Sequence, residues 1–256
     1  MNKSIVLLAG EGLSTHLMYN FLKKNFSVQR VILEDPVSRS VFLRRRFQRL
    51  GLIPVLGQIL FQLIVLPALK VQSKRRLKEI ASKYGLDDTP IPEALISRVD
   101  SVNSEHTRVL LKSLNSSVIV VNGTRIISIE TLQSTSSPFV NIHAGMTPAF
   151  RGVHGAYWAM AQDLPDLCGV TVHLVDAGID TGKILAQALI HAKPEDNFAT
   201  YPLIQLGVGL PLLKTAIDKL LAHNVQFIQP PDCPSRLWSH PTFWGYLWRR
   251  IFRNIK

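Results

Sequence analysis

The chain has 256 residues, 46% hydrophobic and 18% charged, which is enough apolar material for one large folded domain. This composition excludes a disordered, collagen-like or coiled-coil protein. The formal net charge of +11 indicates an anionic partner, of which nucleic acid, a membrane surface and a phosphorylated substrate are the candidates. The two cysteines, Cys168 and Cys233, form neither a CxxC motif nor a disulfide framework, which indicates thiols in a reducing cytoplasm.

A short apolar run at residues 4–8 ends in a glycine-rich turn, and a helical pattern follows to about residue 24. The run is too short for a signal peptide and stops at glycine, so it predicts a strand followed by a turn and a helix. Backbone amides at the start of such a helix favour anions, and Gly10, Gly12 and Ser14 are therefore candidates for binding a substrate phosphate. A simple strand-to-helix turn is the alternative.

The positive charge is concentrated in two patches. Ten basic residues and no acidic residue lie between Arg39 and Lys78, and four more basic residues lie among the last eight residues. These fourteen cations exceed the net charge, so the rest of the chain has a slight excess of acidic residues. Helical patterns are expected at residues 36–49 and 72–84, on either side of an uncharged segment.

That uncharged segment, residues 50–69, reads LGLIPVLGQILFQLIVLPAL. We expect Pro54 to open a helix and Pro67 to end it, which leaves a helix of about 18 Å at ~1.5 Å per residue. This length is short of the ~30 Å hydrocarbon core of a bilayer. Three interpretations remain open: a buried helix or oligomer contact, a helix lying in a membrane interface, and a true membrane span.

Further along the chain, apolar runs and helical patterns alternate. Strands are expected at residues 29–33, 117–121, 140–143, 170–175, 184–191 and 225–228, and helices at residues 104–114, 155–162 and 201–221. This alternation predicts an α/β fold, a Rossmann-like and mostly parallel sheet with helices on both faces. We expect a catalytic domain at residues 1–229 with an apolar helical insert at about 36–84, then a Pro-rich linker and an aromatic, basic tail at residues 230–256.

The densest cluster of polar residues begins on the strand expected at residues 140–143. Asn141 and His143 alternate on this strand, so both point to the same face, at the carboxyl end where α/β sheets place ligands. The strand expected at residues 170–175 leads into a loop that contains Asp180. If the two strands are neighbours, an amide, an imidazole and a carboxylate converge, and such a trio can hold an oxyanion and transfer a proton.

Metal binding and a serine triad are two further interpretations of this cluster. His143, His154, His173 and Asp180 lack the short helical spacing of common zinc motifs, so no metal is expected. A serine triad would need the G-x-S-x-G turn, which the cluster lacks. A polar turn with histidines satisfied in the core is the remaining alternative.

The cluster resembles the folate-dependent formyltransferase family, which includes glycinamide ribonucleotide, methionyl-tRNA and sugar N-formyltransferases. The resemblance lies in three elements in the family's order: Asn141-Ile142-His143, the loop from Pro148 to Gly152, and Asp180-Thr181-Gly182. It implies the family's fold and a reaction in which a primary amine attacks the formyl carbon of 10-formyltetrahydrofolate. Asn141 and His143 would stabilise the oxyanion, Asp180 would orient His143, and no metal would be required.

The resemblance also implies binding residues. The pterin pocket would be lined by residues after the central strand and in the later loop, namely Gly123, Arg125, Ile126, Ile127, Val175, Asp176 and Gly178. Arg151 and His154 are candidates for contact with the acceptor, and packing of His154 under its loop is the alternative. The loop Ala144-Gly145-Met146-Thr147-Pro148 and the apolar insert depart from the family pattern, which puts the identity of the acceptor in doubt.

An amino sugar of the cell envelope, nucleotide-linked or lipid-linked, is the expected acceptor. About 28 residues follow residue 228, too few for the RNA-binding barrel of a methionyl-tRNA enzyme, so nucleic acid is not expected as a partner. We expect a cytoplasmic protein at the inner face of a membrane, held there through residues 39–78 and 238–256. The alternatives are glycinamide ribonucleotide or methionyl-tRNA formyltransferase-like activity, hydrolysis of formyltetrahydrofolate, and a non-catalytic membrane-docked binding protein.

Overall fold

The computed structural model describes residues 4–230 and 232–256. Pro231, within the expected linker, lies outside the described residues, as do the side chains of Arg39, Val41 and Phe42. The strands are β1 Ser4–Gly10, β2 Ser27–Glu34, β3 Ile96–Val99, β4 Val118–Asn122, β5 Phe139–His143, β6 Arg151–Gly152, β7 Gly169–Leu174, β8 Ile184–Leu189 and β9 Leu237–Trp238.

Seven of these strands form one sheet in the order β3-β2-β1-β4-β5-β7-β8. The pairs from β3 to β5 are parallel, whereas β5–β7 and β7–β8 are antiparallel. The mostly parallel α/β fold is thus confirmed. A strand at residues 225–228 was a wrong prediction, because in the described chain this segment makes only an isolated antiparallel bridge between Ile228 and Ile184.

Ten α-helices connect or cover these strands in the described residues. They are α1 Leu13–Asn25, α2 Arg39–Leu50, α3 Leu52–Leu60, α4 Leu66–Gln72, α5 Lys74–Lys83, α6 Glu105–Leu114, α7 Ile129–Leu132, α8 Gly155–Ala161, α9 Tyr201–Leu221 and α10 Phe243–Phe252. Short 3-10 turns lie at Glu93–Leu95 and Pro165–Leu167, and a π-helical turn at Phe61–Val65 joins α3 to α4.

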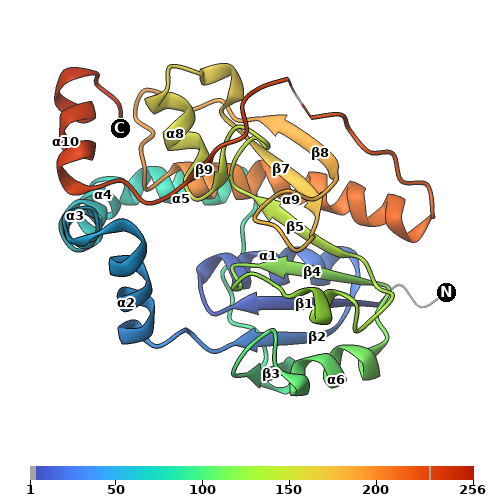
Figure 1. Ribbon diagram of the computed structural model, residues 1–256. Coiled ribbons are helices and arrows are strands. Elements are labelled where there is room, and N and C mark those ends of the chain that lie inside the picture. Colours follow the sequence, from blue (N-terminus) through green and yellow to red (C-terminus); the bar gives the residue numbers. More distant parts are fainter. Residues whose placement is uncertain (1–3, 231) are drawn as a thin grey trace.

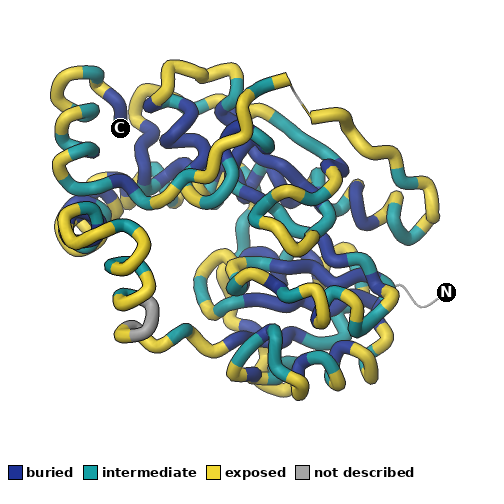
Figure 2. The backbone as a smooth tube through the Cα atoms, viewed as in Figure 1, coloured by how far each residue is buried: buried dark blue, intermediate teal, exposed yellow. Residues whose placement is uncertain are grey.

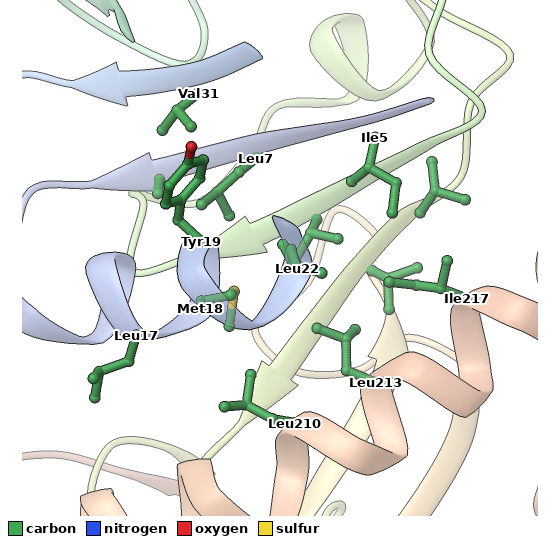
Figure 3. Close-up of a cluster of buried hydrophobic side chains, with 14 of the residues drawn as sticks. Ile5, Leu7, Leu17, Met18, Tyr19, Leu22, Val31, Leu210, Leu213 and Ile217 are labelled. Atoms are coloured by element: carbon green, nitrogen blue, oxygen red, sulfur yellow. The ribbon is translucent and has the colours of Figure 1, made fainter. Parts of the chain in front are cut away.

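The two faces of the sheet are buried by different helices. On one face, α1 and α9 place Met18, Leu22, Leu213 and their neighbours against β1, as Figure 3 shows. On the other face, Leu111 of α6 packs on the alternate residues of β1 and β4. The central strands are therefore buried on both sides, which explains their uninterrupted apolar runs.

A third apolar cluster holds the insert and the tail to the rest of the fold. Phe61 lies at its centre and contacts the rings of Phe198 and Tyr246 at centroid distances of 4.7 and 5.1 Å. The tail adds β9, which pairs with β6, and α10, which packs on α3. In Figure 1, α2, α3 and α10 form one side of the molecule, at the edge toward which the arrowheads of β1, β2 and β4 point.

The insert contains a single continuous helix, Leu52–Gln72, which is long and apolar enough to cross a membrane by length and composition alone. The expectation that Pro67 ends this helix was wrong. The N–H of Leu66 donates to the carbonyl of Phe61, five residues back, so the helix widens into a π turn just before the proline. This turn relieves the clash that a proline ring otherwise makes with a carbonyl of the preceding turn.

Candidate active site

The three polar residues singled out on β5 and in the loop after β7 lie together. Antiparallel pairing of β5 with β7 sets Asn141 opposite His173. The Asn141 amide donates to His173 Nε2 at 3.2 Å, since His173 Nδ1 donates to the Leu174 carbonyl at 2.8 Å. His143 Nδ1 lies 3.3 Å from Asp180 Oδ2, and His173 Nε2 lies 3.6 Å from Asp180 Oδ1. The carboxylate therefore stands between the two imidazoles.

His143 is almost completely buried, and burial lowers the pKa of its imidazole. The nearby Asp180 carboxylate opposes this effect and offsets only part of it, so the neutral ring is favoured. Its Nε2–H donates to the Phe150 carbonyl at 2.6 Å. Gly145 stands against the same edge of the ring, where an added Cβ would lie 2.6 Å from Nε2. The Phe150 carbonyl and Gly145 thus fix the Nε2 edge of the ring, and Asp180 faces Nδ1 on the other edge.

Asp180 is held by its backbone and by a main-chain donor. Its φ of +52° is the left-handed conformation, which aspartate tolerates better than most residues. Oδ2 accepts the N–H of Gly152 at 2.8 Å. Burial alone would raise the pKa of this carboxyl, but His173, His143 and the Gly152 amide together hold it below its usual value. Asp180 is thus a charged partner for His143 in the folded chain.

The trio opens onto one cavity of about 340 Å³. All the residues expected to line a pterin pocket border it: Gly123, Arg125, Ile126, Ile127, Val175, Asp176 and Gly178. The loop after β4 is anchored by Glu34, which accepts the Arg125 amide at 2.9 Å and pairs with its guanidinium. The two walls of the cavity come from the loops after β4 and after β7, which are about fifty residues apart in sequence. The loops lie close together because β4, β5 and β7 are consecutive strands of the sheet.

A second cavity, of about 470 Å³, shares Asp180 with the first. It is bordered by Arg151 and Lys183, while Pro148 and Phe227 supply apolar surface. Arg151 donates from its guanidinium to the Ile179 carbonyl at 3.2 Å, which fixes it beside the Asp180 loop. The Asp180 carboxylate therefore borders both cavities. The first is lined by apolar residues together with the charged side chains of Arg125 and Asp176, and the second carries two cations, Arg151 and Lys183.

The remaining expected binding residues, Gly10, Gly12, Ser14 and His154, do not border the first cavity. Gly10 is pressed against the carbonyl of Gly123, where a Cβ would lie 2.5 Å away. Gly12 precedes α1, and the Ser14 hydroxyl accepts a hydrogen bond from Asn122 at 3.1 Å. These residues stand at the carboxyl end of β1, beside β4. His154 points away, with Nε2 at 2.9 Å from His240 Nδ1 and its ring against Phe198.

Several residues of the site escaped the sequence analysis. The Phe150 carbonyl and the Gly152 amide act through the backbone, so residue type carries no signal for them. His240 comes from the tail, 86 positions after His154, and no motif links the two. Gln58 of α3 donates to the His240 carbonyl at 2.8 Å, and Arg46 of α2 donates to Gln58. Hydrogen bonds thus run from the insert through the tail to the loop beside Asp180.

No group of three or more His, Cys, Asp or Glu side chains within residues 4–230 and 232–256 is placed to hold a metal ion. The two cysteines are free, and burial raises the pKa of Cys168 to about 11, so this thiol is not a ready nucleophile or ligand.

Comparisons with known proteins point to one family. The family model described as formyl transferase matches residues 67–202. A methionyl-tRNA formyltransferase from Thermodesulfovibrio yellowstonii is 37% identical over 111 residues, 43% of this chain and 36% of that protein. The chain spans between about a third and a half of the length of the first curated relatives that it matches.

Two solved structures show the same fold. The N-formyltransferase from Helicobacter canadensis, in complex with folinic acid and dTDP-3-aminofucose, has a TM-score of 0.55 at 16% identity, over 93% of this chain and 71% of that one. Phosphoribosylglycinamide formyltransferase from Streptococcus pneumoniae has a TM-score of 0.54 at 19% identity, over 86% of this chain and 99% of that one.

Proposed function

The chain belongs to the formyl transferase family, and we propose that it moves a formyl group from 10-formyltetrahydrofolate to a primary amine. The observation that carries this proposal is the convergence of Asn141, His143 and Asp180 on one cavity whose other wall is the expected pterin pocket. The folate is a co-substrate, and no step of this chemistry calls for a metal.

In the proposed reaction, the amine nitrogen bonds to the formyl carbon and the carbonyl oxygen becomes an oxyanion. The Asn141 amide has two N–H groups, of which His173 accepts one, so the second is available to the oxyanion. His143 would stabilise the oxyanion from the place where the Phe150 carbonyl and Asp180 hold its ring. The bond from the formyl carbon to the folate N10 then breaks, and N10 takes up the proton that the amine loses.

Asp180 has two tasks in this scheme. Its charge stabilises His143 whenever the ring gains a proton, because Oδ2 faces Nδ1 at 3.3 Å. It also borders both cavities, which is the position needed to pass a proton between donor and acceptor through water. Groups preorganised in this way are typically each worth about 10²–10³ in rate.

The pterin ring is proposed to lie in the first cavity, against Gly123, Arg125, Ile126 and Ile127 on one side. Val175, Asp176 and Gly178 would line the other side. The backbone between β4 and α7 lies outside helices and strands, and the polar ring would bond there to groups other than the Arg125 N–H, which Glu34 accepts. The folate complex named for the Helicobacter canadensis protein supports a folate site in this fold.

An amino sugar of the cell envelope is the proposed acceptor, nucleotide-linked or lipid-linked. The fold shared with an N-formyltransferase that binds dTDP-3-aminofucose supports this choice. Arg151, beside the second cavity, would bind the anionic part of the acceptor together with Gly10, Gly12 and Ser14. His154 is proposed to act indirectly, by holding the loop that bears Arg151 and Gly152.

A peripheral location at an anionic membrane surface completes the proposal. Residues 39–78 and 238–256 carry the excess of positive charge and lie side by side in the fold, since α10 packs on α3. An anionic surface attracts such a patch, by about 1 kcal/mol per cation close to the lipid.

The test is turnover of the purified chain with 10-formyltetrahydrofolate and a panel of nucleotide-linked and lipid-linked amino sugars. Asn141→Ala and His143→Ala should each lower kcat by a factor of about 10²–10³. His106→Ala, at an exposed position of α6, should leave kcat unchanged. Product analysis with and without the amine separates transfer from hydrolysis, which would release formate in both cases. Full turnover by both cavity variants would refute the assigned roles.

A further inference from the structure

The exposed apolar side of the insert helix is continuous and belongs to one face. Its exposed side chains recur every three to four residues: Leu52, Ile53, Leu56, Leu60, Leu63, Ile64 and Val71. The Leu63 side chain, for example, is 70% exposed. The opposite face is buried, at Val55, Gln58, Phe61, Val65 and Leu69. An isolated exposed leucine is ordinary, but a whole helical face of them marks an interaction site.

The buried face prevents this helix from crossing a bilayer, although its 21 residues are long enough. Phe61 is fully buried between the rings of Phe198 and Tyr246, and Gln58 donates to the His240 carbonyl. A spanning helix would have to leave all of these contacts and expose the core of the catalytic half. The helix therefore presents only its outer face to whatever binds it.

Helix α10 extends the same surface. Its exposed residues Trp244, Trp248, Ile251 and Phe252 are spaced for one face of a helix. The two helices are in direct contact, because a Cβ added to Gly57 of α3 would lie 2.6 Å from the Trp244 ring. Figure 2 shows exposed residues along α2, α3 and α10 on one side of the molecule, where α10 and α3 pack together.

Cations flank this apolar surface. Exposed basic side chains are Arg44, Arg45 and Arg49 on α2, Lys70 near the end of the insert helix, and Lys74, Arg75 and Lys78 on α5. On α10, Arg249 is turned inward over the Trp158 ring at 5.1 Å, so the exposed cations beside the apolar surface come from α2 and from residues 70–78. From residue 39 to residue 78 no acidic residue interrupts them. Apolar side chains bordered by cations complement an anionic lipid leaflet, whose headgroups and acyl chains have the same arrangement.

We propose that the exposed faces of Leu52–Gln72 and α10 insert together into one leaflet of an anionic bilayer, with the insert helix lying in the membrane plane. This inference rests on the membrane location proposed above and specifies the inserted side chains. A second copy of the chain or another protein would need to cover the apolar face and its cationic rim, and the rim favours anionic lipid over another basic copy.

The test uses flotation of the full chain with phosphatidylcholine vesicles containing about 30% phosphatidylglycerol. Flotation is expected with these vesicles and to a much smaller extent with pure phosphatidylcholine. The uncharged change Leu63→Gln with Ile64→Gln should weaken partitioning by about tenfold or more. Val109→Gln, an exposed valine on α6 outside this surface, is the matched control and should partition normally.

Insertion is read from the chain's own tryptophans. Trp248 is 53% exposed in the lipid-free fold, so its emission should shift to the blue on vesicles and be quenched by lipids brominated on the acyl chain. Trp248→Phe should remove part of this signal, with Trp244 supplying the rest, without abolishing flotation.

Flotation without acyl-chain quenching would overturn insertion while leaving the surface location intact, and no flotation would overturn both. A lipid-free dimer that Leu63→Gln dissociates, with no vesicle binding, would assign the face to a second copy and overturn the proposal. Formyl transfer to a soluble amine measures the catalytic proposal separately, since the inserted residues do not border either cavity.

Discussion

The pair of histidines that joins the segment after β6 to the tail, His154 and His240, should make the stability of the fold depend on pH. His154 Nε2 lies 2.9 Å from His240 Nδ1. Burial, with a contribution from the neighbouring His240, lowers the pKa of His154 from 6.5 to about 3. Burial and the charge of Arg46 lower the pKa of His240 to about 4. Both rings are therefore neutral in the folded chain at pH 5, where the unfolded chain binds a proton on each.

The size of the effect follows from these values. Since the unfolded state binds more protons between its pKa near 6.5 and the folded values, stability is fully present above pH 6.5 and is lost as the pH falls. At about 1.4 kcal/mol per pKa unit, lowering the pH from 6.5 to 5 removes about 2 kcal/mol per histidine. The pair together removes about 4 kcal/mol, a large share of a typical unfolding free energy of about 5–15 kcal/mol.

Urea unfolding followed by circular dichroism from pH 5 to pH 7.5 measures this loss directly. Replacing both residues, His154→Gln with His240→Gln, should flatten the pH dependence by about 4 kcal/mol, whatever it does to stability at pH 7.5. The remaining slope belongs to His143, whose pKa burial also lowers. His106→Gln, at an exposed position of α6, should keep the full slope. If the double variant changes the free energy of unfolding by the same amount at every pH, the two histidines are not the source of the pH dependence.

Two further predictions concern the insert. Phe61→Ala should lower the free energy of unfolding by about 3–5 kcal/mol, because it empties a fully buried site. Leu63→Ala, on the exposed face, should change this free energy by less than about 0.5 kcal/mol. Equal effects of the two variants in urea unfolding would contradict the assignment of the two faces. Arg76→Ala should cost about 3–5 kcal/mol, because it leaves the buried Asp196 carboxylate without the guanidinium that donates to it at 2.8 and 3.0 Å. Arg75→Ala, 93% exposed, is its control and should cost about 0–1 kcal/mol in the same assay.

The meeting of Asn141, His143 and Asp180, the proposed catalytic trio, could be predicted because its signals are local. Strand periodicity places Asn141 and His143 on one face, and the order of motifs supplies Asp180. The sheet then brings these residues together, because β5 and β7 are neighbours in it. The spacing alone could not establish that adjacency, and the resemblance to a family supplied it.

The histidine pair and the anchoring of the insert could not be predicted. His240 reaches His154 only because β9 pairs with β6, a contact between segments more than 80 residues apart. The rule that proline ends a helix also failed at Pro67, because the rule assumes a strict i→i−4 ladder and the chain departs from it one turn earlier. Residues 225–228 have strand-like composition, but they meet a partner strand at a single position.

The π turn sets how the two halves of the insert helix are rotated relative to one another. From Phe61 the buried residues recur every four positions, at Val65, Leu69 and Ser73. A regular α-helix turns about 100° per residue, so this spacing would rotate the buried face by about 120° over the twelve residues. The wider turn at Phe61–Val65 takes up part of that rotation and keeps the two faces in register. If this turn returned to regular winding with its length unchanged, the segment after it would rotate about the helix axis and its exposed side chains would move toward the core. The insert helix is therefore expected to tolerate changes of side chain on its outer face far better than changes that abolish the π turn.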